Sequence, residues 1–325
     1  MIIGNMKRNI YIYSKLWMIL FVLMGAACTN QVEDAIPVSG LPIEFSVQSD
    51  WKEIPNTRLI DDNGTMKFTQ GDKVQIFGFH KSSQWAVENV QFMYDVDNHV
   101  DNRTLGQKVE FDGTNWNYTP KRFWPKEGLL DFYASYPCDS YNSSIHYDVE
   151  KKMMTYENNL TQDLLYGLAT DRDRAKGNPV PIWMVHALAK VRIILDKSLG
   201  DIGTVQVSGY KTGHFSPMNN NDGVPVWEID DDKTPIYADF SKYEGKVDEE
   251  LKNNNSVTVF ILRDKITGLK MWNSVGDEID ASAKIKDLKF EAGKVYNLTI
   301  SKSNGVRKKN TNSRSIAMSV RCVSE

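Results

Sequence analysis

The chain has 325 residues, with 42 acidic and 39 basic side chains, a formal net charge of −3 and three cysteines. This charge balance argues against a nucleic-acid partner, which would require a basic surface. Three cysteines cannot supply a disulfide framework, so hydrophobic cores must hold the fold, and the length suits two domains of roughly 100–150 residues each.

Residues 1–27 are typical of a secretory signal peptide. Basic residues precede an apolar run at 16–27, which is shorter than the roughly 20 residues needed to cross a bilayer. Cys28 follows this run directly. A bacterial lipoprotein requires such a cysteine, because its thiol carries the lipid and the residue becomes the mature N-terminus. We therefore predict that Cys28 is lipidated; a plain signal peptide with an incidental cysteine is the alternative.

The mature chain is dominated by short runs in which apolar and polar residues alternate. These runs lie at 43–47, 73–79, 129–137, 189–195, 204–210, 256–262 and 294–300. Alternation of β-branched and aromatic residues with polar ones is the pattern of half-buried strands. Asp112-Gly113 and the Asn/Asp/Gly-rich segment 219–227 are typical hairpin turns. Only 160–169 has a helical pattern, so we predict an all-β protein built from sandwiches.

Two prolines, a glycine and several charges at 171–181 indicate a linker, and we place a domain boundary near residue 180. Residues 28–40 are then a spacer, and the N-terminal domain covers 41–180. The C-terminal domain covers 181–301. The remaining residues, 302–325, form a tail that we expect to be flexible.

No motif in the sequence supports catalysis. The histidines occur singly, without a paired metal-binding spacing, at His80, His99, His146, His186 and His214. There is no nucleophile elbow and no phosphate loop. We therefore expect no metal, no cofactor and no enzymatic activity. A hydrolase with a pair of carboxylates that the sequence does not reveal is a third possibility, which only an activity screen would detect.

Aromatic residues are abundant and have two interpretations. The tryptophans of the mature chain are Trp51, Trp85, Trp116, Trp124, Trp183, Trp227 and Trp272. Most rings of this kind pack in strand cores or pair across strands. Exposed rings could instead stack on sugars, and a monomeric, surface-anchored lipoprotein that binds glycan is the alternative function that we keep open.

Several stretches, taken in order, resemble the fimbrillin family, the lipoprotein-derived pilus subunits of certain anaerobic Gram-negative bacteria. They are 68–79 (FTQGDKVQIFGF), 116–137, 163–169 (DLLYGLA), 186–193 (HALAKVRI) and 288–301 (LKFEAGKVYNLTIS). The resemblance implies two transthyretin-like β-sandwich domains. It also implies a structural subunit of an adhesive cell-surface pilus, exported as an outer-membrane lipoprotein, with no catalytic role and with other pilus subunits as partners.

The resemblance further implies that a trypsin-like protease removes the first strand, so that a donor strand from another subunit fills the groove that this strand leaves. Here the first strand is 41–47, and the cleavage loop is 50–60, which contains Arg58. Arg58 as an ordinary loop arginine is the alternative. The apolar side chains of the first strand are Ile43, Phe45 and Val47.

The tail contains a candidate donor strand at 315–323. Its apolar side chains, which alternate with others, are Ile316, Met318 and Val320. Buried in a groove, each would contribute roughly 1.5–3 kcal/mol. A disordered terminus with an accidental pattern is the alternative. The sequence does not distinguish a stalk subunit from an anchor or a tip.

Overall fold

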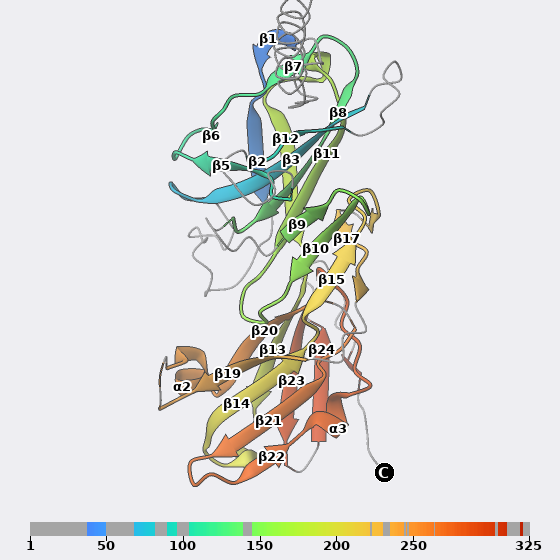
Figure 1. Ribbon diagram of the computed structural model, residues 1–325. Coiled ribbons are helices and arrows are strands. Elements are labelled where there is room, and N and C mark those ends of the chain that lie inside the picture. Colours follow the sequence, from blue (N-terminus) through green and yellow to red (C-terminus); the bar gives the residue numbers. More distant parts are fainter. Residues whose placement is uncertain are drawn as a thin grey trace, which may run out of the picture.

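The computed structural model describes residues 38–49, 68–81, 90–95, 104–138 and 145–302 apart from 222, 230–234, 244, 246 and 263, and the strands at 305–310 and 319–320. Figure 1 shows these residues as a succession of β-sheets along an elongated molecule. The all-β prediction and its two β-sandwich domains are confirmed. In the described part of the chain, no helix is both long enough and apolar enough to span a bilayer.

The N-terminal domain is built on one large sheet with the strand order β2-β12-β11-β8-β3-β5-β6, and β4 also pairs with β3. The strands are β2 (Phe45–Ser49), β3 (Lys73–Lys81), β4 (Val90–Met93), β5 (Gln107–Phe111), β6 (Trp116–Asn117), β8 (Leu129–Tyr136), β11 (Leu165–Arg172) and β12 (Val180–His186). The two end strands, β2 and β6, approach each other. The sheet therefore wraps around its own core, which includes Ile76, Trp124 and Phe132.

A short antiparallel pair continues from this domain at the end drawn uppermost in Figure 1. It consists of β1 (Val38–Pro42) and β7 (Phe123–Pro125). The predicted first strand, 41–47, is thus divided between β1 and β2. The chain changes partner here, because the Ile43 amide donates to the Arg122 carbonyl and the Glu44 carbonyl accepts from the Val180 amide.

A four-stranded sheet lies between the two ends of the molecule, with the order β18-β15-β10-β9. Its strands are β9 (Ile145–Asp148), β10 (Met153–Glu157), β15 (Thr212–Phe215) and β18 (Glu228–Ile229). Strands from both halves of the sequence therefore share one sheet. They bury their own core, in which Trp227 is 2% exposed and its Nε1 donates to the Ala187 carbonyl at 2.7 Å. A small hairpin, β16 (Asn220–Asn221) with β17 (Val224–Pro225), precedes β18.

The C-terminal domain is a sandwich of two sheets, β20-β13-β23-β24-β25 and β19-β14-β21-β22. The first contains β13 (Ala189–Leu195), β20 (Ser256–Ile261), β23 (Val295–Ser301), β24 (Gly305–Asn310) and β25 (Ser319–Val320). The second contains β14 (Ile202–Gly209), β19 (Ile236–Ser241), β21 (Gly268–Asn273) and β22 (Glu278–Asp280). The short helices are η2 (Arg174–Lys176), η3 (Lys197–Leu199), α2 (Glu249–Asn254) and α3 (Ser282–Ile285).

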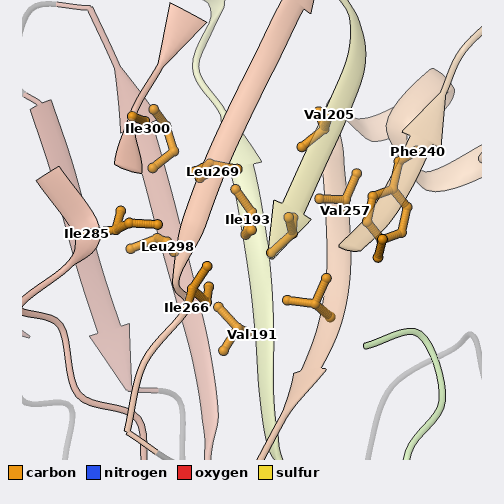
Figure 2. Packing of buried hydrophobic residues seen from close by; sticks show 14 of the residues in the cluster. Val191, Ile193, Val205, Phe240, Val257, Ile266, Leu269, Ile285, Leu298 and Ile300 are labelled. Carbon is orange, nitrogen blue, oxygen red and sulfur yellow. The ribbon is translucent and has the colours of Figure 1, made fainter. Parts of the chain in front are cut away.

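Alternation along the strands builds the core of this sandwich. In β13, Val191 and Ile193 are fully buried, whereas the residues between them are only partly buried. Figure 2 shows Val191 and Ile193 in the same cluster as Leu269 of the facing sheet and Leu298 of β23. Because successive side chains of a strand point to opposite faces, the apolar set of each strand lies on the inner face.

The structure also differs from the sequence prediction at residues 180–186, 165–172 and 305–310. Strand β12 belongs to the N-terminal sheet, so that sheet extends to His186 rather than to residue 180. Residues 165–172 form strand β11 rather than a helix: the strand lies between β8 and β12, and a run buried on both faces cannot be distinguished from a helix by periodicity. Residues 305–310 of the tail form β24, which extends the sheet antiparallel to β23.

Candidate functional site

Strand β2 is the terminal strand of the large N-terminal sheet in the described part of the chain. It pairs with β12 in parallel, with Phe45 opposite Val180 and Val47 opposite Ile182, whereas the other pairs in this sheet are antiparallel. A terminal strand has hydrogen-bonded neighbours along one edge only. Strand β2 can therefore be separated from the sheet by breaking a single ladder, as can the shorter strands β4 and β6.

Ile43, just before this strand, and two side chains of the strand form a buried row. Ile43 is 0%, Phe45 4% and Val47 5% exposed. The residues between them, Glu44 and Ser46, are exposed and partly exposed respectively, and Gln48 after them is exposed. The structure thus brings the three apolar residues expected in the first strand onto one face, against the domain core.

Aromatic rings surround the middle of this row. The ring of Phe45 meets that of Phe132 edge to face, with 5.2 Å between centroids, and that of Tyr118 at 5.8 Å. Burial raises the pKa of the Tyr118 phenol to about 12, although a hydrogen bond with the Arg122 backbone acts in the opposite direction. Tyr118 therefore stays neutral and acts as a hydrogen-bond donor at physiological pH.

Hydrogen bonds from side chains fix the backbone just before β2. The Tyr118 hydroxyl donates to the Ile43 carbonyl at 2.8 Å. Asn178 bridges the chain, since its Oδ1 accepts from the Glu44 amide at 2.8 Å and its Nδ2 donates to the Pro42 carbonyl at 3.1 Å. Sequence reasoning missed Tyr118 and Asn178, because they lie about 75 and 135 positions from their partners and no local pattern connects them.

The burial of this strand is large relative to the stability of a domain. Three buried apolar side chains contribute roughly 1.5–3 kcal/mol each, about 5–9 kcal/mol together. A whole domain is stable by only about 5–15 kcal/mol. Removal of β2 without a replacement would therefore expose enough apolar surface to threaten the N-terminal domain, whereas another strand with three apolar side chains in the same register could restore it.

The structure does not describe most of the other residues predicted from the sequence. Cys28, Arg58, Ile316 and Met318 lie outside the described residues. Val320 is in β25, opposite Lys308 of β24. In Figure 1, β23 and β24 belong to the end of the molecule opposite to β2. Among the residues that the structure describes, no cluster of three or more His, Cys, Asp or Glu side chains could hold a metal ion.

Two β-sandwich domains with a buried terminal strand in the first define the structural class of this protein. The fimbrillin-like family model matches residues 57–317, most of the chain, and the protein belongs to this family. Membership of this family indicates a pilus subunit or an adhesion-type protein that is exported to the cell surface.

Several solved structures are similar to this chain at low sequence identity. A proposed cell adhesion protein of Bacteroides ovatus is 14% identical, with a TM-score of 0.50 and coverage of 83% of this chain and 96% of the other. A proposed cell adhesion protein of Bacteroides uniformis is 15% identical, with a TM-score of 0.47 and coverage of 86% and 98%. The tip fimbrial protein Mfa3 of Porphyromonas gingivalis, truncated at its C-terminus, is 9% identical, with a TM-score of 0.38 and coverage of 74% and 93%. No curated protein matches the chain.

Proposed function

We propose that this protein is a structural subunit of an adhesive pilus and that it assembles by exchange of its first strand. The observation that carries this proposal is the state of β2 and of the residues just before it: β2 is a terminal strand with a single ladder, and Ile43, Phe45 and Val47 are buried in the domain core. Loss of such a strand leaves a groove with unpaired backbone groups and exposed apolar sites. A strand from another subunit can form hydrogen bonds with those backbone groups and fill the apolar sites with its own side chains.

Maturation would begin with export as a lipoprotein anchored in the outer membrane through Cys28. A trypsin-like protease would then cut after Arg58, which follows β2 in the chain. Because the cut falls after Ser49, the last residue of β2, it separates β1 and β2 from the rest of the domain while leaving β3 onward intact. The lipid would leave with the removed segment.

The donor would be the tail of another subunit. Ile316, Met318 and Val320 have the same i, i+2, i+4 spacing as Ile43, Phe45 and Val47. Since β24 lies far from β2 in Figure 1, the geometry favours exchange between subunits over insertion of the protein's own tail. In this scheme the role is structural, without a cofactor and without catalysis.

Limited trypsin digestion of the purified protein tests this proposal. We expect one early cut at Arg58, identified by intact mass, followed by larger oligomers in size-exclusion chromatography. The variant Arg58→Gln should stay uncut and monomeric, and the matched control Lys52→Gln should behave as the parent protein. Deletion of residues 312–325 should leave the cut intact but prevent the oligomers. Early cleavage elsewhere, or a cut protein that remains folded and monomeric, would contradict the mechanism.

A further inference from the structure

The outer face of the β19-β14-β21-β22 sheet displays an array of polar and aromatic side chains. The inner residues of these strands, such as Val205 and Leu269, fill the core in Figure 2, so the alternate residues point outward. The outward residues are Tyr237 and Asp239 of β19, Thr204 and Gln206 of β14, Lys270 and Trp272 of β21, and Glu278 and Asp280 of β22. We call this set the β14 face.

Strand register arranges the β14 face in cross-strand rows. Gln206 lies between Asp239 and Lys270, and Lys270 is followed by Asp280 on β22. One row further along β14, Thr204 lies beside Trp272. In the row on the other side of Gln206, Tyr237 lies beside Ser208, which is buried, and Ser208 is followed by Gly268.

Aromatic rings stand at opposite corners of this array. Tyr237 is 54% exposed and Trp272 is partly exposed. They are separated by two strand spacings and four residues, which corresponds to roughly 17 Å between their Cα atoms. The Tyr237 ring, being mostly exposed, contributes little to the core, and each of the two rings offers a flat apolar surface with a polar edge. The array between them is long enough for an oligosaccharide of several sugar units.

The charges of the β14 face are largely paired with one another. Lys270 Nζ donates to Glu278 Oε1 at 2.8 Å, and this contact raises the pKa of Lys270. Gln206 Nε2 donates to Asp239 Oδ1 at 2.8 Å. The face therefore offers both hydrogen-bond donors and acceptors at short range, with an excess of carboxylates. Sugar hydroxyls both donate and accept hydrogen bonds, so they can engage both kinds of group.

We propose that the β14 face binds a neutral oligosaccharide, with Tyr237 and Trp272 stacking on sugar rings and Asp239, Gln206 and Lys270 bonding to hydroxyl groups. The carboxylate excess opposes acidic glycans. A basic peptide would match the charge of the face, but the side chains between the two rings are polar, and polar groups suit sugar hydroxyls better than apolar peptide side chains. This site lies on the C-terminal sandwich and does not depend on strand exchange at β2.

Isothermal titration calorimetry with defined hexasaccharides tests the site. The probes are maltohexaose, cellohexaose, xylohexaose and mannohexaose as neutral chains, hexagalacturonate as the acidic chain and a Gly-Lys repeat peptide as the basic competitor. We expect binding of at least one neutral chain. Tyr237→Ala should weaken that binding by about tenfold or more, the change that corresponds to 1.4 kcal/mol. Tyr237→Phe should keep the affinity within about twofold because the ring remains.

Matched variants separate binding from folding. Trp183 in β12 is 55% exposed on the N-terminal domain, so Trp183→Ala removes an equally exposed ring and should leave binding unchanged. Asp239→Asn should weaken binding without lowering the melting temperature. Absence of binding to all four neutral chains overturns the proposal, as does binding that survives Tyr237→Ala or is lost in Trp183→Ala. Binding of the basic peptide alone would assign the face to a protein partner instead.

Discussion

Replacement of Phe45 by alanine tests whether β2 is an integral part of the N-terminal core. The Phe45 side chain is 4% exposed, and its ring packs edge to face on Phe132 and against Tyr118. Phenylalanine-to-alanine substitutions at such sites cost about 3–5 kcal/mol through lost burial and the remaining cavity. Because a terminal strand can partly relax into the cavity, we expect the lower end of this range, about 3 kcal/mol.

Urea unfolding monitored by circular dichroism measures this loss. The transition of the N-terminal domain should shift to lower urea with an unchanged slope, which indicates a change in stability rather than in the denatured state. Gln48→Ala is the control, because Gln48 is exposed on the same strand and its loss should change the unfolding free energy by less than about 0.5 kcal/mol. A Phe45→Ala loss below about 1 kcal/mol would refute the packing argument and weaken the case for a strand whose removal opens the domain.

Two further predictions concern the middle of the molecule and its response to acid. Trp227→Phe removes the bond from Nε1 to the Ala187 carbonyl and leaves that buried carbonyl without this donor, so urea unfolding should show a loss of about 1–3 kcal/mol; an unchanged midpoint would contradict the role of this contact in joining the two halves. The pKa of Asp171 lies below its ordinary value of 3.8, because it accepts a hydrogen bond from Lys81 and faces that charge. Its contribution to stability is thus complete above pH 3.8 and is lost as the pH falls through the lower folded pKa. Thermal melts between pH 2 and pH 6 should show a smaller loss in acid for Asp171→Asn than for the parent, and parallel curves would contradict this linkage.

Local pattern determined much of this architecture. The alternation at 43–47 predicts a strand with Ile43, Phe45 and Val47 on one side, and the structure buries these three residues on the core face. The alternation at 189–195 likewise predicts the inner row of β13. Such predictions succeed because the pleat of a strand fixes which residues share a face, whatever the neighbouring strand.

Only the tertiary structure decided which strands become neighbours. Strand β10, at 153–157, pairs with β15, at 212–215, so the domain boundary expected near residue 180 does not separate the sheets. Likewise, the parallel pairing of β2 with β12 and the contacts of Tyr118 and Asn178 join residues far apart in the sequence. The periodicity of a segment indicates which of its residues are buried on one face and which are exposed on the other. Which strand it pairs with depends instead on the shape and burial of the whole molecule.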